Sequence, residues 1–283
     1  MTCNPKLVVF DLDETLGYFS EFGMFWDALK SYVKTNNIDF TMNQEFFDKT
    51  LDLYPEFLRP NIINILNYLK QKKHAKHCYK LMIYTNNQGP CEWAIQIKSY
   101  FENKIKYKLF DQIIAAFMIN GKQVELCRTT NMKTHSDFIK CTKVPKNTDI
   151  CFIDDLYHPG MKNERIYYIN IKPYSYSLTF ATIVDRFIKS QFLTNETTNT
   201  DIDASSMKAY IIAFMKRFTY IYVDKPDSEY VVDKIISKKI LQHLQMFFKN
   251  HNITRRLKMN QSSSDNLDDD KPNKAKNKTK RKH

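Results

Sequence analysis

The chain has 283 residues, of which 43% are hydrophobic, and a formal net charge of +12. This length suffices for one large domain or two small ones. Seven of the basic residues lie within the last thirteen positions, and removing their charge from +12 leaves +5 on the rest of the chain. The distribution excludes a uniformly basic nucleic-acid-binding body and confines the strong positive charge to a tail.

The predicted elements alternate along the chain. Short apolar runs rich in β-branched residues predict buried strands at 6–10, 80–85, 149–155 and 165–171. Apolar residues at helical spacing predict helices at 22–33, 43–51, 60–69, 91–101, 135–141 and 178–192. Asn43 is a good N-cap, and Pro60 suits the start of a helix. Two apolar runs around Asn120-Gly121 predict a β-hairpin within 111–132.

Strands that alternate with helices predict an α/β fold, a Rossmann-like and mostly parallel sheet with helices on both faces. A small helical insert at 17–59 and the hairpin insert at 111–132 interrupt a core of residues 1–192. A polar linker at 193–206 precedes an apolar stripe at 207–258, which predicts a C-terminal helical hairpin. The low-complexity, lysine-rich end at 259–283 predicts a disordered basic tail.

The cysteines and the apolar runs indicate the compartment. The six cysteines form no C-x-x-C pair, and several lie in apolar segments, so we expect reduced thiols and no disulfide framework. The longest apolar runs are too short to cross a bilayer, and the N-terminus lacks the apolar region of a signal peptide. We therefore expect a soluble intracellular protein, cytoplasmic or nuclear, without a membrane partner.

Polar side chains gather where three of the predicted strands end. They are Asp11, Asp13 and Thr15 after the first strand, Thr85, Asn86 and Asn87 after the second, and Asp154 and Asp155 after the third. Ligands of open parallel sheets bind beyond the carboxyl ends of the strands. Carboxylates that converge there repel one another without a cation, and their oxygens suit Mg²⁺. The sequence therefore predicts a magnesium site at this edge.

These residues also suit phosphoryl transfer. Asp11 is ionised at neutral pH and can attack phosphorus directly, which gives an aspartyl-phosphate. Asp13 can protonate the leaving oxygen and then activate water. Lys133 and the Thr85 hydroxyl can bind the phosphoryl oxygens, with Asn86 beside them. We therefore expect a phosphomonoester hydrolase that acts by charge neutralisation and positioning.

Four segments resemble the motifs of the haloacid dehalogenase-like (HAD) superfamily. "DLDET" is similar to its first motif, "LMIYTNN" to its second, Lys133 to its third and "CFIDD" to its fourth, in that order over residues 6–190. All four in order are specific, whereas any one alone is weak. The resemblance implies that Asp11 is nucleophile and metal ligand. It implies that Asp13 is the acid/base, with its backbone carbonyl on the metal, and that Asp154 is the further metal ligand.

Within the superfamily, the chain resembles the RNA polymerase II C-terminal-domain phosphatase-like group. "DLDETL", "LRPNI" and the hairpin between the second and third motifs carry this resemblance, although the 15–60 segment is more helical than in that group. It implies a phosphorylated protein, on serine or threonine, as substrate. "TNNQGP" also resembles polynucleotide 3′-phosphatases, and nucleic acid could bind through the tail. A small phosphoester remains a further alternative.

Several assignments stay open at this level. Arg128 and Lys140 compete with Lys133 for the basic role, and Asp155 is either a supporting residue behind the metal ligands or merely polar. A catalytically silent binding protein could use the same crevice. The acids after the first strand could also be a solvated strand end. The sequence leaves the oligomeric state and the role of the tail open.

Overall fold

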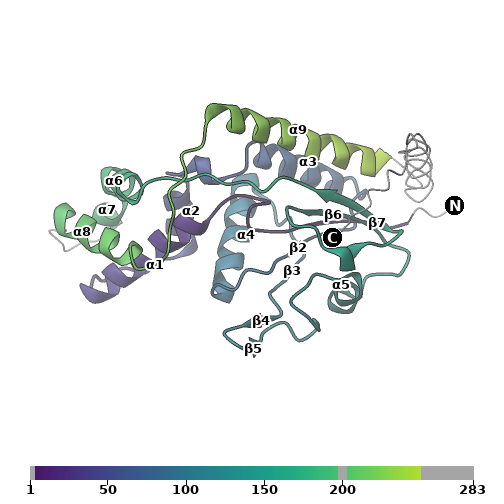
Figure 1. Cartoon of the computed structure of the whole chain (residues 1–283), viewed down its shortest axis with the longest axis horizontal. Helices are drawn as coiled ribbons and strands as arrows, with labels where there is room; N and C mark the ends of the chain where they lie inside the picture. Colours follow the sequence, from purple (N-terminus) through teal and green to yellow (C-terminus); the bar gives the residue numbers. More distant parts are fainter. Residues whose placement is uncertain (1–3, 197–202, 250–283) are drawn as a thin grey trace, which may run out of the picture.

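The computed structural model describes residues 4–196 and 203–249 (Figure 1). The strands of this part of the chain are β1 (Lys6–Phe10), β2 (Lys80–Tyr84), β3 (Gln112–Ile114), β4 (Met118–Ile119), β5 (Lys122–Gln123), β6 (Asp149–Asp154) and β7 (Ile166–Asn170). Its α-helices are α1 (Ser20–Thr35), α2 (Gln44–Leu51), α3 (Ile62–His74), α4 (Cys91–Ile105), α5 (His135–Thr142), α6 (Phe180–Ser190), α7 (Phe192–Glu196), α8 (Ala204–Met215) and α9 (Asp227–Lys249).

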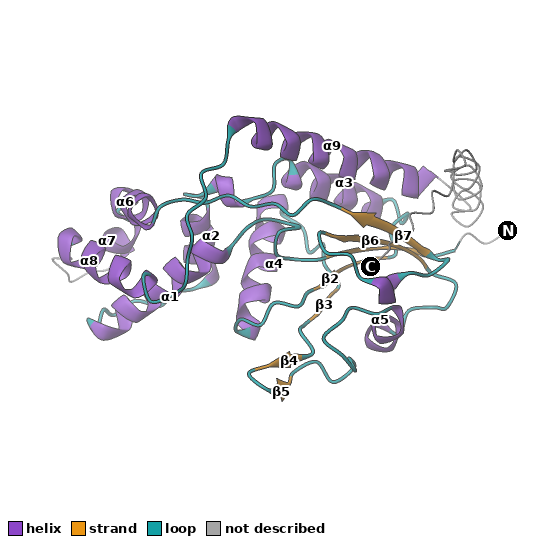
Figure 2. Cartoon of the chain, viewed as in Figure 1, coloured by secondary structure: helices purple, strands orange, loops and turns teal. Residues whose placement is uncertain are grey.

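The described residues form a parallel five-stranded sheet in the order β3-β2-β1-β6-β7 (Figure 2). The chain builds outward from β1 to β2 and β3, and then returns to the other side of β1 with β6 and β7. The order therefore reverses between β1 and β6, which is where open α/β sheets place their ligands. This confirms the predicted α/β class with a mostly parallel, Rossmann-like sheet.

Alternate side chains of the central strands enter two separate cores. Val8 and Phe10 of β1 join the larger core, which α3 and α4 help to form, whereas Leu7 and Val9 join the smaller core around Phe138 of α5. Because both faces are covered, the strands read as continuous apolar runs. This pattern is why the four strands at 6–10, 80–84, 149–154 and 166–170 could be predicted.

A cluster of helices occupies one end of the molecule, beyond the carboxyl ends of the strands (Figure 1). Helix α8 packs on α1 and α6, and α2 packs on α4. The predicted helical insert supplies α1 and α2, and the side chain of Asn43 accepts a hydrogen bond from the backbone N–H of Phe46, as expected of an N-cap. Aromatic side chains such as Phe22, Trp26 and Phe47 fill the interior of this cluster.

The insert at 111–132 differs from its prediction. Asn120 and Gly121 take the positive φ angles that a tight hairpin turn needs, and they join the antiparallel strands β4 and β5. These strands have only two residues each. The first apolar run instead forms β3, which pairs in parallel with β2 at the edge of the main sheet. Burial of Ile114 against the core outweighs local hairpin pairing.

The C-terminal prediction was wrong in arrangement. Helix α8 packs on α1 and α6, whereas α9 crosses to the other end and packs on α3 and β7, so the two are not a hairpin (Figure 1). Lys6 Nζ donates hydrogen bonds to the carbonyls of Phe247 and Phe248 at the end of α9. The predicted linker at 193–206 overlaps most of α7 and the first residues of α8. Residues 250–258 and the predicted tail at 259–283 lie outside the described residues.

Among the described helices, none combines the length and the apolar character that a membrane span requires.

Candidate active site

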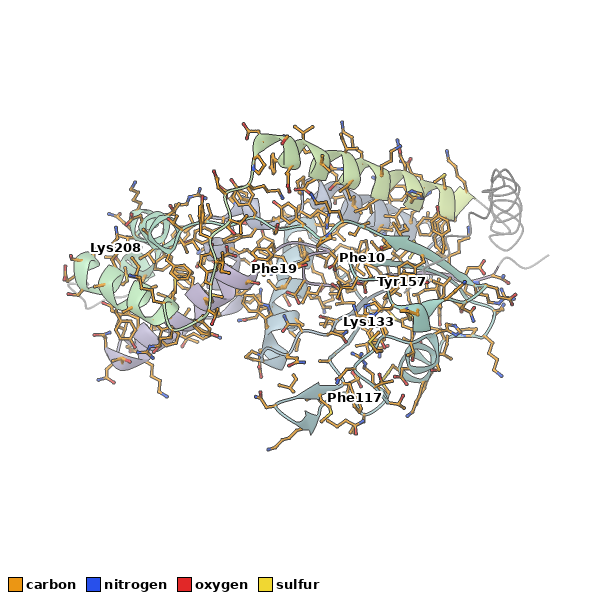
Figure 3. All side chains as sticks on the ribbon, viewed as in Figure 1. Phe10, Phe19, Phe117, Lys133, Tyr157 and Lys208 are labelled. Atoms are coloured by element: carbon orange, nitrogen blue, oxygen red, sulfur yellow. A yellow bond between two sulfur atoms is a disulfide. The ribbon has the colours of Figure 1, made fainter. Side chains whose placement is uncertain are left out.

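Three charged side chains meet at the carboxyl ends of β1 and β6. Lys133 Nζ lies 2.5 Å from Asp11 Oδ1 and 2.7 Å from Asp154 Oδ2. All three residues are buried. Lys133, labelled in Figure 3, comes from the loop that precedes α5, and its ammonium group contacts Asp11, the residue directly after β1. A buried ammonium group therefore pairs with two carboxylates at the switch point of the sheet.

The negative charge of this cluster exceeds what Lys133 neutralises. Burial raises the pKa of Asp11 to about 6, although Lys133 opposes the shift. Burial also acts against the charge of Asp154, but the contact with His158 Nε2 at 3.4 Å and the hydrogen bond from Lys133 outweigh it and lower the pKa of this carboxyl. The pKa of Lys133 is raised, because its two carboxylates outweigh the burial that opposes its charge. Of the two carboxyls that Lys133 contacts, Asp11 is therefore the one that binds a proton more readily.

A third carboxylate completes a set of oxygen ligands. Single carboxylate oxygens of Asp11, Asp154 and Asp155 lie within 4.8 Å of one another. Burial and the charges of Asp11 and Asp154 raise the pKa of Asp155, and the Thr15 hydroxyl donates to it at 3.1 Å. Hard oxygen donors at this spacing, with uncompensated charge, fit Mg²⁺. Asp155 therefore belongs to the acidic group itself.

The Asp13 carboxyl lies outside this group of three, although the charges of Lys133 and Asp155 act on it. Asn87 Nδ2 donates to Asp13 Oδ2 at 2.8 Å, and burial raises the pKa of this carboxyl. The backbone N–H of Asn87 donates in turn to Thr85 Oγ1 at 2.9 Å. Asp13 also lines a pocket between α1 and the start of α4. Its side chain is thus fixed at the wall of an open space, with a raised affinity for a proton.

The remaining predicted residues lie around the same edge. Thr85 is buried directly after β2, and the carbonyl oxygen of the Asn86 side chain accepts a hydrogen bond from Arg128 at 2.8 Å. Arg128 also donates to the backbone carbonyls of Thr85 and Ala115. Lys140 is exposed on α5. Of the three basic residues that the sequence left in competition, Lys133 is the one in contact with Asp11.

The loop after β1 depends on Arg59, a residue that sequence reasoning did not single out as functional. Its guanidinium is buried and donates to the carbonyls of Glu14, Thr15 and Lys172. Gly17 closes the same loop, since an added Cβ would lie 2.5 Å from the carbonyl oxygen of Phe57. The only feature of the sequence that could have indicated a role for Arg59 is its position just before Pro60. Nothing in the sequence indicated that His158 contacts Asp154 or that Asn87 contacts Asp13.

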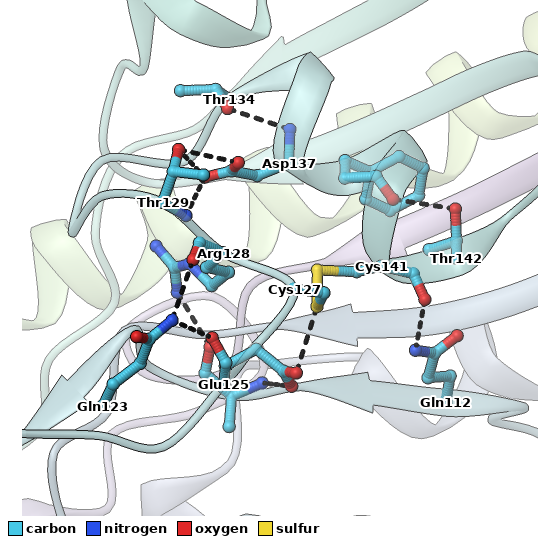
Figure 4. The surroundings of a disulfide bond; sticks show 12 residues. Gln112, Gln123, Glu125, Cys127, Arg128, Thr129, Thr134, Asp137, Cys141 and Thr142 are labelled. Carbon is cyan, nitrogen blue, oxygen red and sulfur yellow. Dashed lines mark hydrogen bonds between the residues drawn. A yellow bond between two sulfur atoms is a disulfide. The ribbon is translucent and has the colours of Figure 1, made fainter.

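A disulfide bond joins Cys127 to Cys141 of α5 (Figure 4). The expectation that the cysteines stay reduced was therefore wrong for this pair, while Cys78 and Cys151 are buried free thiols as expected. The bond could not be predicted from the sequence because the two cysteines are fourteen positions apart and only the folded loop brings them together. Glu125 lies beside both sulfurs, but the disulfide removes the thiolates that a metal would need there.

The disulfide anchors the loop that carries Arg128 and Lys133. The same loop is tied to α5 by Thr129, whose backbone N–H and hydroxyl both donate to the Asp137 carboxylate (Figure 4). Cys127 and Thr129 flank Arg128, so the loop is fixed to α5 on both sides of the guanidinium. These contacts fix the path by which Lys133 reaches the two carboxylates.

The chain matches no known family model, no curated protein and no solved structure. The interpretation of the site therefore rests on its geometry and chemistry.

The buried ion cluster makes a prediction about stability. The substitution Lys133→Met leaves Asp11 and Asp154 buried without their ammonium partner, and should lower the free energy of unfolding by about 3–5 kcal/mol at pH 7.5. Without Lys133, the folded-state pKa of Asp11 rises above its present value of about 6. A carboxyl whose pKa is higher in the folded state loses stability as the pH rises through that value. The deficit should therefore shrink at pH 5.

Urea unfolding at the two pH values measures this difference. Lys140→Met is the matched control, because Lys140 is exposed on α5 and its replacement should change stability by no more than about 0.5 kcal/mol. Equal losses for Lys133→Met at both pH values would contradict the account.

The disulfide makes a second prediction. Cross-linking residues fourteen positions apart restricts the unfolded chain, so Cys127→Ser and Cys141→Ser should each lower the free energy of unfolding by about 3 kcal/mol. The double variant should lose no more than either single variant, because one bond is lost in all three. Urea unfolding with and without dithiothreitol tests this: only the wild type should respond to the reductant. An additive loss in the double variant would show that the two sulfurs are not bonded.

Proposed function

We propose that the protein is a Mg²⁺-dependent phosphomonoester hydrolase that acts through an aspartyl-phosphate, with the catalytic machinery of the HAD superfamily. The observation that carries the proposal is the buried contact of Lys133 with both Asp11 and Asp154 at the switch point of the parallel sheet. A solvated strand end would not require a buried ammonium group between carboxylates. The same contact favours an active enzyme over a silent binding protein, because the nucleophile and its charge partner are both in position.

In the first step, a carboxylate oxygen of Asp11 attacks phosphorus. The bond from Asp11 to phosphorus forms, the bond from phosphorus to the ester oxygen breaks, and Asp13 gives its proton to the departing oxygen. Burial raises the pKa of Asp13, which favours the protonated form that this transfer uses. Lys133 binds the developing negative charge, and the backbone beside Thr85 and Asn86 lies at the same edge of the sheet to receive the phosphoryl oxygens.

In the second step, Asp13 takes a proton from water, whose oxygen attacks phosphorus. The bond to Asp11 breaks, inorganic phosphate leaves, and both carboxyls return to their starting states. Asp11, Asp154 and the backbone carbonyl of Asp13 would hold Mg²⁺, and Asp155 is close enough to contribute. The bound ion would supply positive charge that lowers the pKa of Asp11 and neutralises the phosphoryl group.

The substrate that we favour is phosphoserine or phosphothreonine in a protein. Asp13 lines an open pocket whose other walls come from α1 and the start of α4, and the insert at 17–59 is too short to form a separate cap domain. A 3′-phosphorylated polynucleotide and a small phosphoester are the alternatives.

Two substitutions separate the roles of the acids. Asp11→Asn removes the nucleophile and should abolish both turnover and the phosphoenzyme. Asp13→Asn keeps the nucleophile and should slow turnover by about 10²- to 10⁴-fold, the usual contribution of a general acid–base group. Hydrolysis of p-nitrophenyl phosphate with Mg²⁺, and with EDTA in its place, measures both effects.

Asp185→Asn on the outer helix α6 is the matched control and should leave turnover unchanged, since Asp185 pairs only with Lys208 at the surface among its described contacts. Turnover that survives both EDTA and Asp11→Asn would rule out the mechanism. Rescue of Asp11→Asn, but not of Asp13→Asn, by a better leaving group would reverse the two roles.

A further inference from the structure

A pocket of about 520 Å³ lies between α1 and the start of α4, and Asp13 is part of its wall. Its apolar surface includes Phe19, Met24 and Trp93. Gly23 faces the Trp93 indole, whose nearest atom would lie 3.5 Å from an added Cβ. A larger residue at this position of α1 would project into the pocket. The volume is within the range of ligand-binding pockets, and the absence of a side chain at Gly23 helps to keep it open.

The position of Asp13 determines what this pocket receives. Under the proposed function, on which this inference rests, Asp13 must reach the oxygen of the leaving group. Asn87 holds the Asp13 carboxyl at the pocket wall, next to but outside the group of carboxylate oxygens that Asp11, Asp154 and Asp155 form. The phosphoryl group therefore lies on the side of Lys133, and the alcohol half of the ester extends into the pocket.

The charges of the pocket select among alcohols. Besides Asp13, Asp27 and the exposed Glu92 are the acids of its lining. Lys30, the one basic residue among the described lining residues, has its Nζ 3.6 Å from Asp27 Oδ1, so these two charges offset each other and Asp13 and Glu92 are the remaining acids of the lining. A second phosphate, as in a polynucleotide, would meet acids and no available cation there. A basic side chain would instead pack its aliphatic stem on Trp93 and direct its charge to the acids.

We propose that this pocket is the leaving-group subsite and that it selects a phosphoserine or phosphothreonine peptide with arginine or lysine next to the phosphorylated residue. Gly23, Trp93 and Glu92 are its specificity-determining residues. The subsite favours the peptide because its acidic rim attracts a flanking cation, and it disfavours nucleic acid for the same reason.

The test compares substrates that differ only at this subsite. Three phosphoserine peptides of equal length place arginine, alanine or glutamate beside the phosphoserine, and a 3′-phosphorylated oligonucleotide and acetyl phosphate complete the set. We expect kcat/KM for the arginine peptide to exceed that for the glutamate peptide at least tenfold, mostly through KM. Glu92→Lys should narrow this preference. The oligonucleotide should be the poorest of the esters.

Gly23→Leu tests the pocket itself. It should lower the ratio of kcat/KM for the arginine peptide to that for acetyl phosphate at least tenfold, because the leucine fills the space that the peptide needs. Lys34→Leu, on an exposed position of the same helix, is the matched control and should leave this ratio unchanged. Leucine favours a helix more than glycine does, so the melting temperature of Gly23→Leu should be no lower than that of the wild type.

The outcomes separate this inference from the function on which it rests. Mg²⁺-dependent hydrolysis of acetyl phosphate, combined with equal use of the arginine and glutamate peptides or with preference for the oligonucleotide, would overturn the subsite and leave the aspartate chemistry intact. An unchanged ratio in Gly23→Leu would do the same. Failure of the wild type to hydrolyse any of the substrates with Mg²⁺ would overturn both.

Discussion

The contact between Lys133 and the two carboxylates Asp11 and Asp154 is the constraint on which the rest of the site depends. Burying three charges costs several kcal/mol per ion, and the low dielectric around them makes any unpaired partner expensive. The buried charges are therefore compatible with a stable fold only while all three side chains remain paired. Two carboxylates still share one ammonium group, and burial raises the pKa of Asp11. A site with two carboxylates and one ammonium group is suited to bind a metal cation together with a phosphoryl group.

Contacts between residues that are distant in the sequence hold the cluster in place. The Cys127–Cys141 disulfide and the Thr129–Asp137 contacts fix the loop that delivers Lys133. Arg59 fixes the loop after β1 by donating to backbone carbonyls, which positions the segment that carries Asp13. Helix α1 of the insert then provides one wall of the pocket at which Asp13 is placed. Stability and site geometry thus come from the same contacts.

The features that could be predicted from the sequence are those that depend on interactions between residues close together in the chain. The central strands are continuous apolar runs, the Asn120-Gly121 turn needs positive φ, and the acids follow strand ends, so all of these could be located. The features that could not be predicted depend on packing between residues far apart in the chain. The apolar stripe of α8 and α9 looked like a hairpin because it does not reveal its partners, and the disulfide at Cys127 needed the folded loop. Lys133 could be ranked above Lys140 only by proximity to Asp11.

The most direct test of the central claim is a crystal structure of the protein with Mg²⁺ and beryllofluoride, which mimics a phosphoryl group on aspartate. The account predicts the beryllium bonded to a carboxylate oxygen of Asp11, the metal ion between Asp11 and Asp154, and Lys133 in contact with a fluoride. Asp13 should remain at the pocket wall, facing the open side of the beryllofluoride. Density for the ions elsewhere, or beryllofluoride bound without a bond to Asp11, would contradict the account.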